Sequence, residues 1–117
     1  MRYMLLIGSE KTEAPTAPPS PAAMQDLIQA HARYGEALRA AGKLVEANRL
    51  RPDSDASRVR VKAGHHLVTD GPFAETKETV GGFYLIECDS KEEALGWAKK
   101  VPLRDGNFVE VRPIWAM

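Results

Sequence analysis

The length, composition and charge of this chain exclude several classes of protein. Its 117 residues are the length of one domain, and 44% hydrophobic with 27% charged side chains is a globular mixture, not a disordered one. Sixteen basic side chains balance sixteen acidic ones, so no net charge draws the chain to nucleic acid or anionic lipid. The single cysteine, Cys88, excludes an intramolecular disulfide framework and favours a reducing compartment, by default the cytoplasm.

The first third of the sequence predicts a strand, a loop and a helix. Residues 3–7 are continuously apolar, as in a central strand, and the run is too short for a signal-peptide core or a membrane span. Residues 9–20 contain three prolines and predict a surface loop. Ser20 before a proline favours a helix start, and Gly42 favours its end. Apolar side chains at i, i+3, i+4 spacing place His31 on the buried stripe of this helix.

The middle of the chain predicts a strand followed by a β-hairpin. Residues 44–50 alternate as a second strand, and residues 58–62 alternate basic side chains with valine. A turn at residues 63–65 leads into a strand at residues 66–69. We expect an added hairpin with one basic, solvated face. That stripe carries no interleaved aromatic residues, so it indicates nucleic-acid binding only weakly.

The last third predicts a strand, a helix and a strand. Residues 83–88 are largely apolar, and Ser90 with Glu93 forms a capping box before a helix that Pro102 ends. Residues 108–115 form the final strand, in which a proline favours an edge or end position.

The element order predicts one α+β domain over residues 1–117, with the ferredoxin-like βαββαβ plan and a β-hairpin inserted after the second strand. Two helices cover only one face of a four-stranded sheet. The strands are rich in large apolar side chains, so the other face would expose an oversized apolar patch. We therefore expect a homodimer in which two sheets pack together.

The segment from Val68 to Tyr84 resembles the signature of the YCII-related proteins. It contains the string Asp-Gly-Pro-Phe-Ala-Glu-Thr-Lys-Glu, and the subgroup it resembles is named for its Asp-Gly-Pro-Phe motif, the DGPF subgroup. The opening Met-Arg-Tyr-Met-Leu-Leu-Ile and the closing Val-Glu-Val-Arg-Pro-Ile-Trp are similar to the two ends of that family. The resemblance thus covers essentially the whole chain.

The resemblance implies a dimeric α+β barrel. A histidine–aspartate pair is a proposed active site in YCII-type proteins; the histidine maps to His31 and the aspartate to Asp70. A distant relative removes chloride from a chlorinated hydroxyquinol, and relatives in the DGPF subgroup are often associated with alternative sigma factors. The resemblance therefore leaves both an enzyme and a regulatory partner open.

Six residues are candidates for chemistry, each with a structural alternative. His31 titrates near neutrality and suits proton transfer, or it is a core histidine with one hydrogen bond. Asp70 would fix the tautomer of His31, or it caps a turn through its own backbone. The remaining candidates would bind substrate, although surface exposure or packing also explains them: Phe73, Glu75, Lys77 and Tyr84.

We expect neither a metal nor a cofactor, because no Cys/His spacing of a zinc site and no phosphate-binding glycine loop occurs. His65 and His66 are adjacent at the predicted hairpin tip, where neighbouring strand residues point to opposite faces, so they make a poor metal pair. Cys88 lacks an activating neighbour, which predicts a core position.

The leading hypothesis is a cofactor-independent small-molecule enzyme that catalyses proton transfer, isomerisation or elimination, with His31 as acid/base. Its cleft would lie between the first helix, the sheet and residues 70–78. The rival is a non-catalytic module that binds a ligand or a regulatory partner, including one linked to sigma-factor-controlled transcription.

Overall fold

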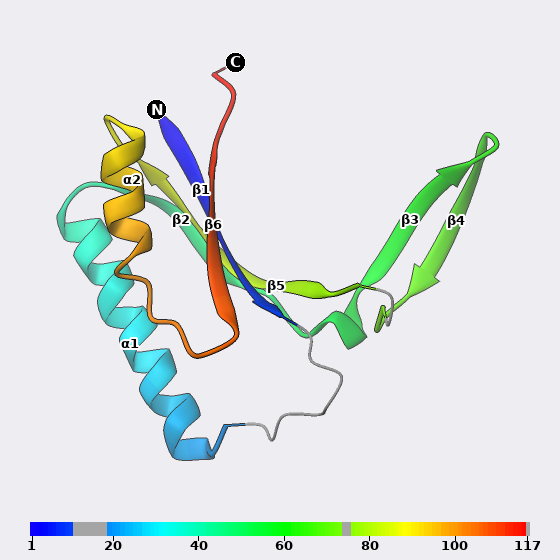
Figure 1. Cartoon of the computed structure of the whole chain (residues 1–117), viewed down its shortest axis with the longest axis horizontal. Helices are drawn as coiled ribbons and strands as arrows, with labels where there is room; N and C mark the ends of the chain where they lie inside the picture. The colour runs from blue at the N-terminus through cyan, green and yellow to red at the C-terminus, as the bar shows by residue number, and fades with distance from the viewer. Residues whose placement is uncertain (11–18, 74–75, 117) are drawn as a thin grey trace.

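The computed structural model describes residues 1–10, 19–73 and 76–116 (Figure 1). The elements follow in chain order: β1 (Arg2–Glu10), α1 (Pro21–Ala40), β2 (Leu44–Arg49), a short 3₁₀ turn η1 (Asp53–Asp55), β3 (Ser57–Lys62), β4 (His65–Asp70), β5 (Glu78–Glu87), α2 (Lys91–Ala98) and β6 (Asn107–Pro113).

The described strands form a four-stranded sheet in the order β2-β5-β1-β6 and a separate hairpin of β3 and β4. Every pair in the sheet is antiparallel, and β1 lies in the centre as its apolar sequence predicts. β6 lies at an edge and ends at Pro113. The helices lie together on one side of the sheet (Figure 1). The predicted α+β order with an inserted hairpin is confirmed.

The ends of both helices follow the capping signals in the sequence. The Ser20 hydroxyl accepts a hydrogen bond from the amide of Ala23 at 3.1 Å, and α1 ends just before Gly42, whose φ of +73° suits glycine. At α2 the Ser90 hydroxyl accepts from the amide of Glu93 at 3.2 Å. α2 ends at Ala98, earlier than Pro102, where the sequence predicted its end. Neither helix of the described residues is long and apolar enough to cross a membrane.

The core lies between the helices and the sheet. Leu5, Leu38, Ile86 and Cys88 are almost completely inaccessible to solvent, which confirms the core position predicted for the cysteine. Burial raises the pKa of the Cys88 thiol and keeps it in the unreactive protonated form.

β5 begins at Glu78, five residues earlier than the sequence predicted, so Gly81 and Gly82 lie within the strand. The carbonyl of Gly81 accepts a hydrogen bond from Leu50 N at 2.9 Å. A Cβ atom on Gly82 would lie only 3.0 Å from the carbonyl oxygen of Asn48. Gly82 therefore lets the β2 backbone approach β5 closely, whereas a Cβ atom on Gly81 would meet nothing within 4 Å.

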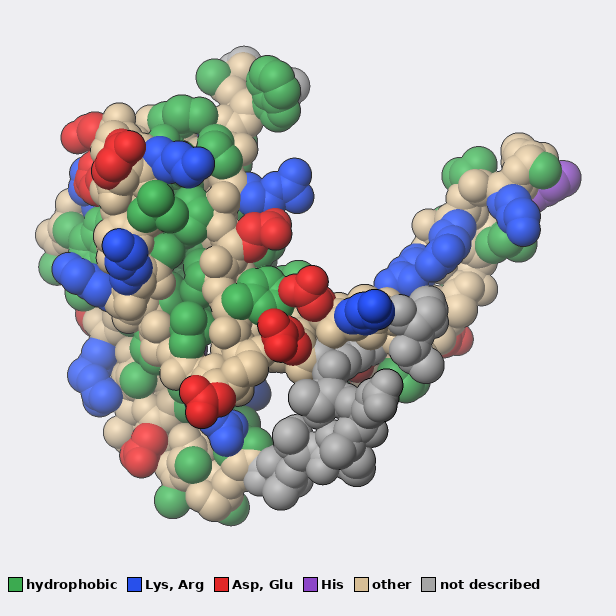
Figure 2. Space-filling view, viewed as in Figure 1, with side chains coloured by type: hydrophobic (Ala, Val, Ile, Leu, Met, Phe, Trp, Pro, Cys, Tyr) green, Lys and Arg blue, Asp and Glu red, His purple; other side chains and the backbone are tan. Residues whose placement is uncertain are grey.

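The β3–β4 hairpin projects away from the sheet (Figure 1). Its turn is Ala63-Gly64, with φ values of +51° and +79°. The sequence placed His65 in this turn, which is wrong, because His65 is the first residue of β4. Figure 2 shows basic side chains along the hairpin, as expected from the alternating sequence of β3. Three valines remain strongly exposed: Val59, Val61 and Val68, at 62%, 69% and 68%.

Candidate functional site

A groove of about 820 Å³ lies between α1, the sheet and the loop that precedes β6. Figure 1 shows the first half of α1 extending beyond α2. The apolar stripe predicted for α1 is divided between the core and this groove. Tyr34 and Leu38 are buried in the core, whereas Met24, Leu27 and Ile28 border the groove. The groove is therefore an apolar-walled depression that one helix and a sheet hold open.

His31 and Tyr84 meet on the wall of this groove. The Nδ1 atom of His31 lies 2.8 Å from the Tyr84 hydroxyl, and the two rings are nearly parallel. The same hydroxyl also lies 3.4 Å from the backbone carbonyl oxygen of His31, to which it can donate a longer hydrogen bond. Tyr84 is in turn packed edge-on against Tyr34. The core thus fixes Tyr84, and Tyr84 fixes the histidine ring.

Burial shifts the pKa values of both side chains. It lowers the pKa of His31, an effect that the Pro102 carbonyl opposes and the positive charge of Arg49 reinforces. Burial raises the pKa of Tyr84. At neutral pH the pair is therefore an uncharged imidazole against an uncharged phenol, and the imidazole can accept a proton.

Two arginines border the groove from other elements. Arg49 ends β2 opposite Gly82, and its guanidinium donates to the sulfur of Met24 at 3.9 Å. Arg104 belongs to the loop before β6, and its backbone amide donates to the side-chain oxygen of Asn107 at 3.0 Å. The side-chain amide of Asn107 donates to the Ser9 hydroxyl at 3.0 Å, which ties this loop to β1. The groove thus has a positively charged rim on a fixed frame.

The Asp-Gly-Pro-Phe segment lies elsewhere, at the base of the hairpin. Asp70 accepts a hydrogen bond from the Ser57 hydroxyl at 2.8 Å, which joins the ends of β4 and β3. The amide of Gly71 donates to the carbonyl of Ala56 at 2.7 Å. A Cβ atom on Gly71 would lie 2.0 Å from the carbonyl oxygen of Asp53, so only glycine fits against η1. The motif therefore anchors the hairpin to the turn before it.

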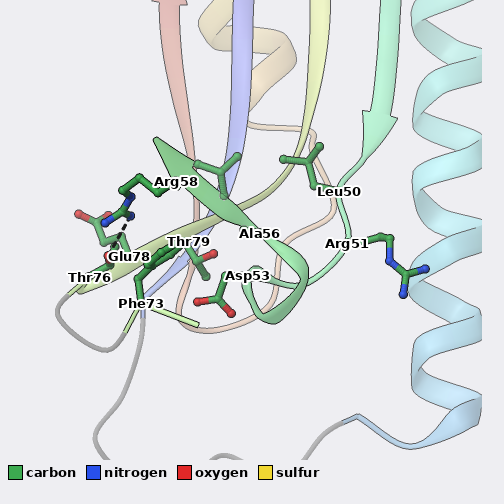
Figure 3. A pocket seen from close by; sticks show the side chains of 10 residues that line it. Leu50, Arg51, Asp53, Ala56, Arg58, Phe73, Thr76, Glu78 and Thr79 are labelled. Atoms are coloured by element: carbon green, nitrogen blue, oxygen red, sulfur yellow. Dashed lines mark hydrogen bonds between the residues drawn. The ribbon is translucent and has the colours of Figure 1, made fainter. Parts of the chain in front are cut away.

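Phe73 is buried beside a smaller cavity of about 320 Å³ (Figure 3). The Arg58 guanidinium lies 3.9 Å from the centre of the Phe73 ring, and it donates to the Thr76 hydroxyl at 3.4 Å. A guanidinium over an aromatic face is a stabilising cation–π contact. Phe73 thus packs at the junction between the hairpin and β5, consistent with the packing role that was its alternative.

The structure brings together only part of the predicted site. His31 and Tyr84 share the groove, but Asp70 lies at the end of β4, where it accepts from Ser57, and it does not border the groove. Lys77 is exposed just before β5. Glu75 lies outside the described residues.

Sequence reasoning missed Arg49 and Arg104. Arg49 lies at the end of the predicted second strand, and Arg104 follows the proline after the second helix. The alternating pattern of the second strand could have indicated Arg49 as a candidate. Nothing in the local sequence, however, indicates that the two arginines border one groove. No cluster of three or more histidine, cysteine or acidic side chains within the described ranges is arranged to hold a metal ion.

Comparison with known proteins finds a family and a relative that this chain resembles. The YCII-related domain matches the chain over residues 1–117. The chain is also 45% identical over 94 residues to the uncharacterized protein R00369 of Rhizobium meliloti (strain 1021), a match that covers 78% of this chain and 72% of that protein.

Proposed function

This chain belongs to the YCII-related domain family, and we propose that it is a small-molecule enzyme that needs no cofactor and uses the groove beneath α1 as its active site. One observation carries the proposal. His31, whose ring is uncharged at neutral pH, borders an open groove and is held by the Tyr84 hydroxyl at 2.8 Å. A histidine that only filled the core would have no such access to a ligand.

In the proposed reaction His31 acts as general base and then as general acid. It takes a proton from a carbon next to a carbonyl group, which leaves an enolate. In an isomerisation it returns the proton at another carbon; in an elimination a leaving group departs with its electron pair. Tyr84 holds the ring in position and can share a proton with Nδ1. Positioned acid–base groups of this kind contribute about 10²–10⁴-fold to a rate.

The structure leads us to give Tyr84 the orienting role that the sequence analysis gave to Asp70. Tyr84 is the hydrogen-bond partner of the His31 ring, and the Asp70 carboxylate is engaged with Ser57 at 2.8 Å.

The test follows proton exchange by NMR in D₂O, with α-angelica lactone and phenylpyruvate as probes. We expect wild-type protein to accelerate deuterium incorporation next to the carbonyl, and His31→Asn to lose about 10²-fold or more of that acceleration. His65→Asn is the matched control, because His65 lies exposed on the hairpin, away from the groove. Wild-type activity in His31→Asn would exclude His31 as the acid/base.

A non-catalytic ligand-binding module is the second candidate, and the Pro102 carbonyl beside His31 favours it. If the imidazole donates to this carbonyl while Nδ1 accepts from Tyr84, both ring nitrogens are occupied and His31 only holds the groove open. Such a module, including one that regulates transcription, would bind probes without exchange. A thermal-shift screen of small aromatic acids, lactones and quinols on wild type and His31→Ala separates binding from turnover.

We also propose that the chain belongs to the DGPF subgroup and forms a homodimer, the dimeric α+β barrel. The subgroup assignment is supported by the intact motif at residues 70–73 and by its anchoring role at the base of the hairpin. The dimer is supported by the sheet face opposite the helices. Its partly exposed apolar side chains are Met4, Leu6, Phe83, Leu85 and Phe108.

A further inference from the structure

We propose that the groove beneath α1 selects anionic ligands, namely small organic acids with an apolar or aromatic body, and that Arg49 and Arg104 bind the acid group. This inference rests on the proposed function for the position of the site and adds the chemical class of its ligand. It assigns to two residues of the groove the substrate-binding role for which the sequence offered Lys77.

Arg49 is the first of the two proposed anion-binding side chains on the groove. Its guanidinium has five N–H donors, and the contact observed within the described chain is with the sulfur of Met24 at 3.9 Å, a weak acceptor. The described residues show no carboxylate in an ion pair with Arg49, whereas Arg39 on the same groove is paired with Glu36. Arg49 is near enough to His31 for its charge to disfavour the imidazolium form. A ligand anion beside Arg49 would therefore lie near the proposed base.

Arg104 is the second of the two proposed anion-binding side chains. It borders the same groove from the loop before β6, the edge strand opposite β2, and the described part of the chain shows no ion pair with its side chain either. Its loop is held in place, because the Arg104 amide donates to Asn107 and Asn107 donates to Ser9. Each guanidinium suits an oxyacid group, since its planar donor array matches carboxylate and phosphate oxygens.

The remaining wall determines the body of the ligand. Met24, Leu27 and Ile28 line one side of the groove, and Ile7 lies among the residues on the sheet side. Ile28 is 44% exposed although it is a large apolar side chain on a helix that faces the sheet. Covering these side chains with an apolar or aromatic group removes them from water, at about 25 cal/mol per Å². The combination favours an amphipathic acid over a free inorganic anion.

The test compares three probes of one shape: 2-naphthoate, 2-naphthyl phosphate and the uncharged 2-naphthylmethanol. None carries a proton next to a carbonyl group, so binding is measured independently of turnover. Titration of ¹⁵N-labelled protein, followed by backbone NMR shifts, locates each probe and gives its Kd. We expect both anions to shift groove amides and to bind about tenfold or more tightly than the alcohol. The tighter of the two anions identifies the acid group as carboxylate or phosphate.

Variants test the two arginines separately. Arg49→Gln and Arg104→Gln should each weaken 2-naphthoate about tenfold and leave the alcohol unchanged, because only the charged contact is lost. The matched control is Arg33→Gln, an exposed arginine of α1 that does not border the groove, and its Kd should match wild type. The proposal would be overturned if the alcohol and the acids bound with equal affinity. It would also be overturned if neither arginine substitution weakened anion binding, or if neither anion shifted the groove amides.

The outcomes also separate this inference from the proposed function. Selective anion binding without proton exchange would support the anion site and favour the ligand-binding module over the enzyme. Proton exchange that depends on His31 but shows no preference for acids would support the enzyme and overturn the anion site.

Discussion

His31 makes a stability prediction that does not depend on catalysis. Its pKa in the folded chain is lowered, first by burial, so the unfolded chain binds more protons in the interval below the ordinary value of about 6.5. By linkage, stability is fully present above that value and falls as the pH drops toward the lowered pKa of the folded state. Urea unfolding of wild-type protein between pH 7.5 and pH 5 should therefore show a loss of stability on the acid side.

Replacing the titrating group identifies its share of this pH dependence. His31→Gln should flatten the loss, whereas His66→Gln, at an exposed site on β4, should leave it unchanged. The carboxylates add their own acid dependence at lower pH, so the difference between the two variants is the quantity to compare. A wild-type slope in His31→Gln would show that the folded state does not suppress protonation of this ring.

Gly71 carries a prediction about the signature motif. In Gly71→Ala the new methyl group would start 2.0 Å from the Asp53 carbonyl oxygen, a backbone atom that cannot rotate away. The hairpin base must shift, and we expect a loss of about 1–3 kcal/mol in the free energy of unfolding. Gly35→Ala is the control, since a Cβ there meets nothing within 4 Å. Chemical denaturation measures the free energy of unfolding of both variants. A Gly71→Ala variant as stable as wild type would contradict the anchoring role of Gly71.

At the level of elements, α2 depends on its cap. It has eight residues, and its amphipathic face alone supports a helix of this length poorly. Ser90→Ala removes the hydroxyl that accepts from Glu93 N and should cost about 1 kcal/mol of stability. Ser90→Asp retains an acceptor and should stay near wild type in the same denaturation experiment. If Ser90→Ala is as stable as wild type, Glu93 and core packing are sufficient to hold α2.

The elements that could be predicted from the sequence are those with local signals. Ser20, Gly42 and Ser90 specify helix ends through hydrogen bonds to near neighbours, and the helical spacing in α1 predicts one apolar stripe. The predicted start of β5 was wrong because Gly82 serves the close approach of β2, a contact between segments distant in sequence. The same limit applies to the site: His31 could be chosen by residue type, but its partner depends on how α1 packs across β5.

The whole molecule is more extended than one domain of this length needs to be. Its radius of gyration is 16.3 Å, against about 13 Å for a compact domain of about this size. The hairpin contributes to the difference, because it projects from the sheet (Figure 1). Its valines are left exposed. A two-stranded hairpin is marginally stable by itself in water. Both the open sheet face and the hairpin are therefore surfaces that packing against a second copy would cover.

The last prediction concerns that assembly. Light scattering after size exclusion should give twice the mass of one chain for wild-type protein, because the face with Leu6, Phe83 and Leu85 is apolar and has no layer on it among the described residues. Leu85→Lys places a charge at this face and should give the mass of one chain, since an unpaired charge is costly to bury. Leu95→Lys, at a position on α2 that is 39% exposed, is the matched control and should stay dimeric. A wild-type monomer at every accessible concentration, or a Leu85→Lys dimer, would show that the sheet face is not the interface. In the second case the hairpin, with Val59 and Val68, becomes the surface to substitute next.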